Sequence, residues 1–322
     1  MSYSIEVFNK AEEILAHRRE QAEASAEFRL EEISEKIPEL LTIKKKLGQI
    51  GLSISRVFFE SSNKQADIEK LKEASLELQE QRKNLLIKNG YDENALEVQY
   101  TCSHCKDTGI HNNRICKCHT ELLKSIEREN LQKHAPLDEC TFESFNTLYY
   151  PEEPENGISP RAKAESILSN CKRYASKFTS QSPSILFMGG TGLGKTHLSL
   201  AIANAVIDHG YSVEYGTAQN ILNDLSNENF GRTDRLKYTE ERILECDLLI
   251  LDDLGTEFKT SYSIACLYNI INTRLSAKLP TIISTNFSQR ELEEKYDQRI
   301  TSRITGEYNT LILLGKDIRY IK

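Results

Sequence analysis

The sequence predicts an α/β fold in which a parallel sheet carries helices on both faces, preceded by an all-α N-terminal domain and a small cysteine-bearing segment. Three observations carry this prediction. From residue 184 onward, short apolar runs alternate with helical patterns, as in βαβ units. Residues 1–97 place apolar residues at helical spacing. Between these parts, four of the eight cysteines fall between Cys102 and Cys118.

Residues 1–97 are rich in Glu, Lys, Gln, Leu and Ala and predict three or more amphipathic helices. Apolar residues such as Leu30, Ile33 and Ile37 recur at a spacing that places them on one helix face. NGYDEN at 89–94 is a turn signal that ends the helices. The simplest interpretation is a self-packed helical bundle. A partner-binding face on that bundle is a further hypothesis, which periodicity alone does not test.

Residues 98–135 predict a zinc-binding segment followed by a connecting helix. YTCSHCKDTGIHNNRICKCH contains one C-x-x-C pair and one closer C-x-C pair, and DTG and HNN supply the turn of a hairpin between them. A tight cysteine cluster in a reduced, intracellular chain favours a metal over disulfides. We expect structural Zn²⁺ on four ligands, Cys102, Cys105, Cys116 and Cys118. His104, His111 and His119 are alternates, and free buried thiols or an iron–sulfur cluster are the competing interpretations.

Residues 136–183 predict a proline-rich linker and a helix that precedes the core, and 184–322 predict the core itself. Its strands are expected at SILFM, VEYGT, CDLLILDDLG, PTIISTNF and NTLILL, with helices from Lys195, about 218, 261–276 and Ser288. We expect no C-terminal lid, because the chain stops soon after the last strand.

A glycine-rich stretch between the first strand and its helix predicts phosphate binding. It fits G-x-x-x-x-G-K-[ST], in which glycines turn backbone N–H groups towards a phosphate and the helix dipole adds positive charge. Lys195 is expected to reach the β and γ phosphates of ATP, and the Thr196 hydroxyl to ligate Mg²⁺. The expected nucleotide contacts are Gly189, Gly190, Thr191, Gly192, Leu193, Gly194, Lys195, Thr196 and His197.

The strand LLILDDLG ends in two carboxylates, where nucleotide hydrolases hold Mg²⁺ and orient water. We expect Asp252 on the metal side and Asp253 as the base or water-orienting group. Asp is shorter than the Glu of many related enzymes, which leaves the reach of Asp253 open. In ISTNF, Thr285 and Asn286 are expected to contact the same water or the γ phosphate.

Three arginines follow these motifs. Arg299 and Arg303 are four positions apart on one predicted helix face, so one of them is expected to act as an arginine finger on a neighbouring subunit's ATP. The alternative is a surface salt bridge. Arg319, close to the end of the chain, is expected to contact nucleotide phosphates in cis.

These motifs in this order resemble the AAA+ ATPases of the bacterial helicase-loader group, of the DnaC and DnaI type, and the IstB-like transposition ATPases. The resemblance covers roughly residues 98–322 and includes TFESFN at 141–146. It implies an ATPase whose hydrolysis is slow and regulatory, with Arg303 as the first choice for the finger, Arg299 as the second, and Arg319 as a sensor.

The resemblance also implies partners. Loaders bind the replicative hexameric DNA helicase through their N-terminal region, deliver it to single-stranded DNA and self-associate with ATP. The segment NENFGRTDRLKY, 227–238, interleaves aromatic and cationic residues that would suit single-stranded DNA. An exposed amphipathic loop is the equally simple alternative. A transposition helper that acts on duplex DNA and a non-hydrolysing adaptor are the other functional hypotheses.

Composition restricts these hypotheses. The 322 residues carry a formal net charge of −7, which argues against non-specific coating of nucleic acid by the whole chain. The N-terminus has no apolar signal region, and no run approaches the roughly 20 apolar residues of a membrane helix. We therefore expect a cytoplasmic protein with no membrane contact.

Overall fold

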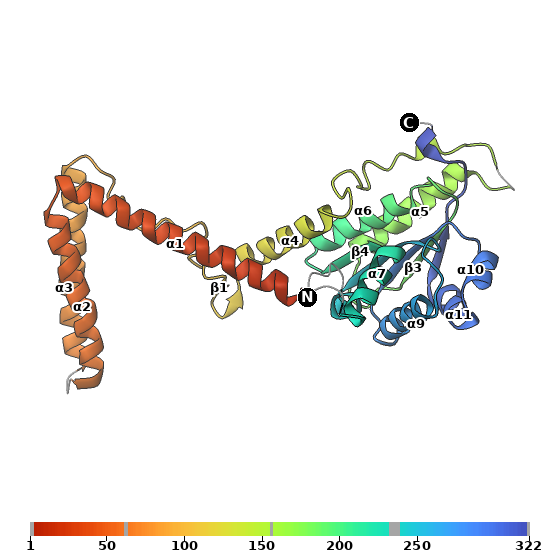
Figure 1. Cartoon of the computed structure of the whole chain (residues 1–322). Helices are drawn as coiled ribbons and strands as arrows, with labels where there is room; N and C mark the ends of the chain where they lie inside the picture. The colour runs from red at the N-terminus through yellow and green to blue at the C-terminus, as the bar shows by residue number, and fades with distance from the viewer. Residues whose placement is uncertain (1–2, 61–63, 155–156, 232–238, 321–322) are drawn as a thin grey trace. The chain divides into compact units, whose positions relative to one another are not determined.

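The computed structural model describes residues 3–60, 64–154, 157–231 and 239–320 (Figure 1). Contacts divide the chain into two compact units. One unit comprises Met1–Ala11 and His119–Lys322, and the other comprises Glu12–Cys118. The larger unit carries the sheet, and the smaller unit carries the N-terminal helices and the cysteine segment.

The sheet confirms the predicted α/β core. Its five strands are all parallel and lie in the order β4-β5-β6-β3-β7. They are β3 (Ile185–Met188), β4 (Val213–Thr217), β5 (Leu248–Leu254), β6 (Thr281–Thr285) and β7 (Asn309–Ile312). The β6 strand lies between β3, which leads into the glycine-rich stretch, and β5, which carries the two aspartates. The carboxyl ends of these three strands therefore meet at one edge of the sheet.

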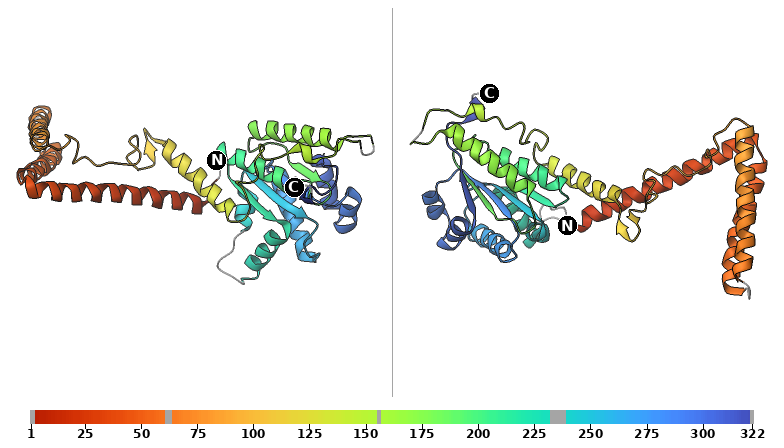
Figure 2. Two further views of the ribbon diagram at one scale, coloured as in Figure 1. Left: turned by 90° about the horizontal axis from the view of Figure 1, so that it is seen from above. Right: turned by 180° about the vertical axis from the view of Figure 1, so that it is seen from behind.

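Helices cover both faces of the sheet (Figure 2). Successive strand residues point to opposite faces, so Phe187 packs into one apolar cluster and Leu186 into another. The first face is covered by α5 (Pro160–Ser176) and α6 (Lys195–Asp208). The second is covered by α7 (Ala218–Asn229), α8 (Glu240–Glu245), α9 (Ser261–Ser276), α10 (Gln289–Lys295) and α11 (Gln298–Glu307).

Side-chain caps fix where several of these helices begin. Ser159 caps α5, whose first residue is Pro160, and Thr217 caps α7 directly after β4. Ser288 forms a capping box with Glu291 at the start of α10. Each cap satisfies an N–H group that the first helical turn leaves unpaired. Helices α7 and α10 therefore start within a few residues of the ends of β4 and β6.

The smaller unit contains the predicted N-terminal helices and the hairpin. The helices are α1 (Ile5–Lys36), which begins in the larger unit, α2 (Glu39–Glu60) and α3 (Lys64–Lys88). Helices α2 and α3 pack against each other. Among the described side chains, the buried apolar cluster of these helices consists of Ile33, Ile37, Leu40 and Leu86. This cluster lies where the end of α1, the start of α2 and the end of α3 meet.

A two-stranded antiparallel hairpin, β1 (Ile110–His111) and β2 (Arg114–Ile115), separates the two cysteine pairs, as predicted. Asn112 and Asn113 form its turn with φ values of +50° and +57°, which asparagine tolerates better than most residues. The connecting helix follows as α4 (Lys117–Gln132), and two short 3₁₀ helices lie at Thr147–Tyr149 and Ile318–Tyr320. Within the described residues, every helix is too short or too polar to cross a membrane.

Candidate functional site

The glycine-rich stretch wraps the start of α6 in a conformation that its glycines permit. Gly194 caps α6 with φ +79°, and a Cβ atom there would lie 2.7 Å from Phe145 Cε2. Gly192 has φ +72°, and a Cβ atom there would overlap the Asp317 carboxylate. Both positions combine a left-handed backbone with a close neighbour, so only glycine fits them.

A segment far upstream braces this stretch from behind. The Tyr150 hydroxyl donates to Leu193 O over 2.7 Å, and the Phe145 ring packs beside His197 with centroids 5.4 Å apart. His197 Nε2 lies 2.8 Å from Thr141 O, so its hydrogen bond is directed to the protein backbone. The sequence patterns gave TFESFN no structural role and did not indicate Tyr150 as a neighbour of the glycine-rich stretch. Its only signal was the aromatic and polar character of this segment ahead of the linker.

Lys195 holds the stretch together from inside. Its ammonium donates to Gly189 O at 2.8 Å, to Gly190 O at 2.7 Å and to Asn286 Oδ1 at 2.6 Å. Burial lowers the pKa of this ammonium, and the carboxylates of Asp253 and Asp252 oppose that shift. The cation therefore lies where the β and γ phosphates of a nucleotide are expected, beside the amide of Asn286.

Asp252 is buried under the start of α6. Its two carboxylate oxygens accept the Thr196 hydroxyl at 3.0 and 2.9 Å. They also accept Ser284 Oγ at 2.6 Å and the Tyr215 hydroxyl at 3.1 Å. Carboxylate and hydroxyl oxygens are ligands that Mg²⁺ prefers. The predicted pair of magnesium ligands, Thr196 and Asp252, is thus brought together, and Ser284 and Tyr215 are partners that sequence reasoning missed.

A cavity at this edge has a volume of about 290 Å³. Asp253 lines it, and burial together with the nearby Asp252 raises the pKa of Asp253. Arg319 also lines it and is paired with Asp317, whose Oδ2 lies 2.9 Å from Arg319 Nη2. The complete lining is Thr191, Gly192, Leu193, Gly194, Lys195, Thr196, His197, Asp253, Asn286, Ile318 and Arg319.

The other predicted residues lie outside this lining: Gly189, Gly190, Asp252, Thr285, Arg299 and Arg303. Arg299 is exposed on α11, and Arg303 Nη2 contacts the Tyr268 hydroxyl at 3.3 Å, with its guanidinium over the Tyr268 ring. Thr285 was expected to reach water or the γ phosphate, and this expectation is wrong for the structure described. It is fully buried and donates its hydroxyl to Leu254 O at 2.7 Å, so it braces β5.

The four clustered cysteines converge as a second site. Their sulfur atoms all lie within 4.8 Å of one another, with Cys102 Sγ and Cys116 Sγ 3.8 Å apart and Cys105 Sγ and Cys118 Sγ 3.3 Å apart. A tetrahedral ion with zinc–sulfur bonds of about 2.3 Å requires sulfur–sulfur distances of about 3.8 Å. The donor set therefore fits Zn²⁺. Among the described residues, this group of possible metal ligands consists of the four cysteines and contains no histidine.

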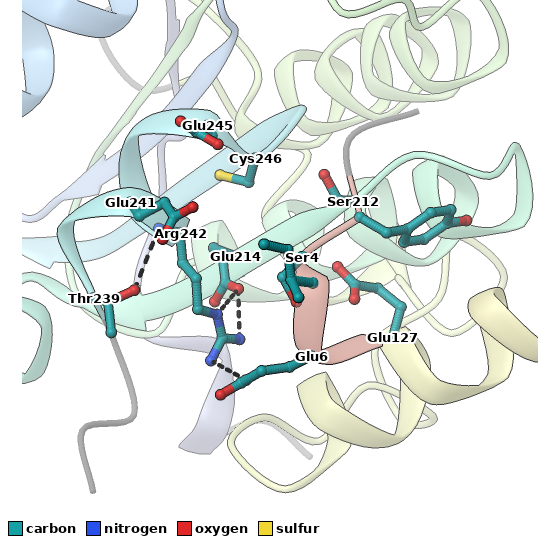
Figure 3. Close-up of a pocket in the computed structure, with 12 residues that line it drawn as sticks. Ser4, Glu6, Glu127, Ser212, Glu214, Thr239, Glu241, Arg242, Glu245 and Cys246 are labelled. Atoms are coloured by element: carbon teal, nitrogen blue, oxygen red, sulfur yellow. Dashed lines mark hydrogen bonds and ion pairs between the residues drawn. The ribbon is translucent and has the colours of Figure 1, made fainter. Parts of the chain in front are cut away.

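A further cavity of about 310 Å³ lies beside the first residues of β4 (Figure 3). Arg242 bridges Glu214 at 2.6 Å and the N-terminal Glu6 at 3.8 Å. Glu127 accepts the Val213 N–H at 2.9 Å, and burial raises its pKa to about 7. Residues near the N-terminus and residues of the sheet line this acidic pocket together. No sequence pattern indicated that these two parts of the chain lie side by side.

The predicted DNA-contacting segment is described only in part. Residues 232–238, which hold its cations and Tyr238, lie outside the described residues. Phe230 is 60% exposed, and its ring centroid lies 6.0 Å from that of Tyr262.

Comparisons with known proteins find an ATP-binding family and proteins named helicase loaders. Residues 166–305 match the family model described as IstB-like ATP binding protein. The chain is 30% identical over 142 residues to the replicative helicase loader DnaC of Buchnera aphidicola subsp. Schizaphis graminum, covering 43% of this chain and 56% of that one. It is 29% identical over 143 residues to the DnaC loader of Escherichia coli (strain K12), covering 42% and 56%.

The chain thus spans just over half the length of these two loaders. Among solved structures, a crystal structure of the DnaC helicase loader superposes with a TM-score of 0.47 at 19% identity, covering 56% of this chain and 99% of that one. The family match coincides with the glycine-rich stretch, Lys195 and the aspartate-bearing strand. Residues 166–305 are therefore similar to IstB-like ATP-binding proteins.

Proposed function

We propose that this protein is an ATP-dependent loader that binds the replicative hexameric DNA helicase, of the DnaB type, and delivers it to single-stranded DNA during replication initiation. The observation that carries the proposal is one cavity in an IstB-like domain that is lined by Lys195, Thr196, Asp253 and Asn286, with the buried Asp252 carboxylate bound to the Thr196 hydroxyl. Similarity to proteins named replicative helicase loaders supports the choice of partner.

In this proposal ATP hydrolysis follows from the chemistry of the site. Lys195 leaves the carbonyls of Gly189 and Gly190 and binds the β and γ phosphates. Thr196 and Asp252 would hold Mg²⁺, which neutralises charge on the phosphate oxygens when it is bound. Asp253 orients the attacking water or accepts its proton. Asn286 exchanges its contact with Lys195 for one with the γ phosphate or the water.

If a second subunit must complete the site, hydrolysis by the isolated chain is slow and regulated by assembly. Arg303, or Arg299 beside it, would reach the ATP of a neighbouring subunit, and Arg319 would act in cis after it leaves Asp317. Transition-state stabilisation by an arginine supplied in trans is worth about 10³–10⁵ in rate. The isolated chain would then bind ATP but hydrolyse it slowly until it self-associates.

The N-terminal part has a separate role in the proposal. The helices within 1–97 bind the helicase, and Cys102, Cys105, Cys116 and Cys118 hold a structural Zn²⁺ that fixes the segment between these helices and the ATP-binding domain. With four thiolates the ion has no open position, which favours structure over catalysis. Single-stranded DNA is contacted by the ATP-binding domain.

The test is a loading assay with the hexameric helicase of the same organism and circular single-stranded DNA that carries one annealed oligonucleotide and is coated with binding protein. The wild-type chain with ATP should raise helicase unwinding well above that of helicase alone, and Lys195→Ala should not. Unwinding that is unaffected by the chain, with either ATP or a non-hydrolysable analogue, would refute the loader proposal.

The family description favours one alternative, a transposition helper that acts on duplex DNA with a transposase. The long helical N-terminal part and the cysteine cluster argue against it. ATP-dependent binding to duplex DNA in preference to single-stranded DNA would support this alternative.

A further inference from the structure

We propose that Ser284 is a positioning residue that pins a β-bulge at Asp252 and Asp253, and that this bulge lets the short Asp253 side chain serve at the water-orienting position. The inference rests on the proposed ATP hydrolysis. Many related enzymes have the longer glutamate at the water-orienting position, so a shorter aspartate there needs a different way to reach the water.

The bulge is visible in the pairing of β5 with β6. Leu251 pairs with Ile283, but the next pair is Leu254 with Thr285. Three steps along β5 thus match two steps along β6, so β5 carries one extra residue at the aspartate pair. Bulges of this kind re-aim side chains and are frequent beside active sites.

The extra residue changes the direction of Asp253. In a regular strand the side chains of Asp252 and Asp253 would point to opposite faces of the sheet. Asp253 instead has φ +53°, a left-handed conformation. Its side chain lines the cavity with Lys195 and Asn286, while the Asp252 carboxylate holds the Thr196 hydroxyl at the same edge. Both carboxylates therefore serve one site.

Ser284 links the two aspartates through one buried hydroxyl. Its side chain is fully buried on β6, opposite the bulge. The hydroxyl donates to Asp252 Oδ1 at 2.6 Å and accepts the Asp253 N–H at 2.9 Å. The same oxygen therefore fixes the carboxylate of the first aspartate and the backbone of the second. Removing it frees Asp253 to leave the left-handed conformation, which is disfavoured for residues other than glycine.

The identity of residue 253 fits this geometry. Asp and Asn enter the left-handed region several-fold more often than most residues, whereas Glu has no such enrichment. A glutamate at 253 would favour a regular strand and lose the bulge. The left-handed backbone of the bulge therefore favours Asp at position 253. The bulge, and not a longer side chain, brings the carboxylate into the cavity.

The test compares Ser284→Ala with Ser199→Ala, a matched control. Ser199 is also fully buried, and its hydroxyl donates only to Lys195 O, at 3.0 Å, among the contacts described. Single-turnover hydrolysis of radiolabelled ATP with protein in excess, ATP affinity and melting temperature are measured for wild type, both serine variants and Lys195→Ala. We expect Ser284→Ala to lose at least tenfold in hydrolysis rate relative to Ser199→Ala. Its ATP affinity should stay within about threefold of the control, and its melting temperature should be similar.

Equal hydrolysis by the two serine variants, with active wild type and inactive Lys195→Ala, would overturn this inference alone. Loss of ATP affinity in Ser284→Ala parallel to its loss of rate would also overturn it, because Ser284 would then act on binding. Wild type that hydrolyses no ATP, or that matches Lys195→Ala, would instead overturn the proposed hydrolysis itself.

Discussion

Gly194→Ala tests whether the conformation of the glycine-rich stretch depends on this one backbone position. Gly194 has φ +79°, and a left-handed alanine costs about 1–2 kcal/mol. The new methyl group would lie 2.7 Å from Phe145 Cε2 and 3.2 Å from the Tyr150 hydroxyl oxygen. Both neighbours are buried, so they can move only by repacking, and overpacking costs about 1–3 kcal/mol.

The two effects together predict a loss of about 2–5 kcal/mol in the unfolding free energy of this unit. We expect at least a tenfold loss of ATP affinity as well, because the N–H groups at the start of α6 shift with the loop. Denaturant unfolding and calorimetric titration with ATP measure the two quantities.

Gly306→Ala is the matched control for this substitution. Gly306 lies in α11 of the same unit, and a Cβ atom there would meet nothing within 4 Å. Alanine in a helix is favoured over glycine by about 0.5–1 kcal/mol, so this variant should be neutral or slightly more stable. If Gly194→Ala matched Gly306→Ala in stability and bound ATP normally, the reasoning about the left-handed cap would be refuted.

Three further predictions concern other parts of the chain. Arg303→Ala should leave ATP affinity within about twofold but slow hydrolysis in assemblies by about 10³ or more, and lost ATP binding would instead show action in cis. Because the pKa of Glu127 is raised from 4.5 to about 7, the folded state keeps a proton that the unfolded state releases between these values. The unfolding free energy should therefore fall as pH rises through this window. Glu127→Gln should flatten this dependence of the unfolding free energy on pH. An unchanged dependence in the variant would contradict a raised pKa at Glu127. Purified protein should contain one zinc per chain by elemental analysis. Cys102→Ser or a chelator should lower the melting temperature of the 12–118 unit without changing ATP affinity. Full stability without the metal would contradict a structural role for the ion.

Local patterns predicted most of the core. Each parallel strand is a short apolar run, and its polar end marks the functional edge, as LLILDD shows for β5. The glycine-rich stretch was identifiable because phosphate binding constrains consecutive residues. The cysteine cluster was identifiable because four ligands lie close together in sequence on either side of a hairpin.

Long-range contacts could not be predicted in the same way. Tyr150 braces Leu193 from 43 positions away, and Ser284 meets Asp252 and Asp253 through a register shift that no spacing encodes. The packing of residues near the N-terminus against α8, shown by the contact between Glu6 and Arg242, also depends on tertiary structure alone.

In the proposed function, the Lys195 site controls an ATP-dependent complex with the replicative helicase. The decisive measurement is multi-angle light scattering on the wild-type chain mixed with the helicase of the same organism, with and without ATP, with Lys195→Ala as the control. We predict a large complex that forms or changes mass with ATP for the wild-type chain and does not respond to ATP for the variant. Two separate species under every nucleotide condition would contradict the claim, and duplex DNA with a transposase would then become the partners to test.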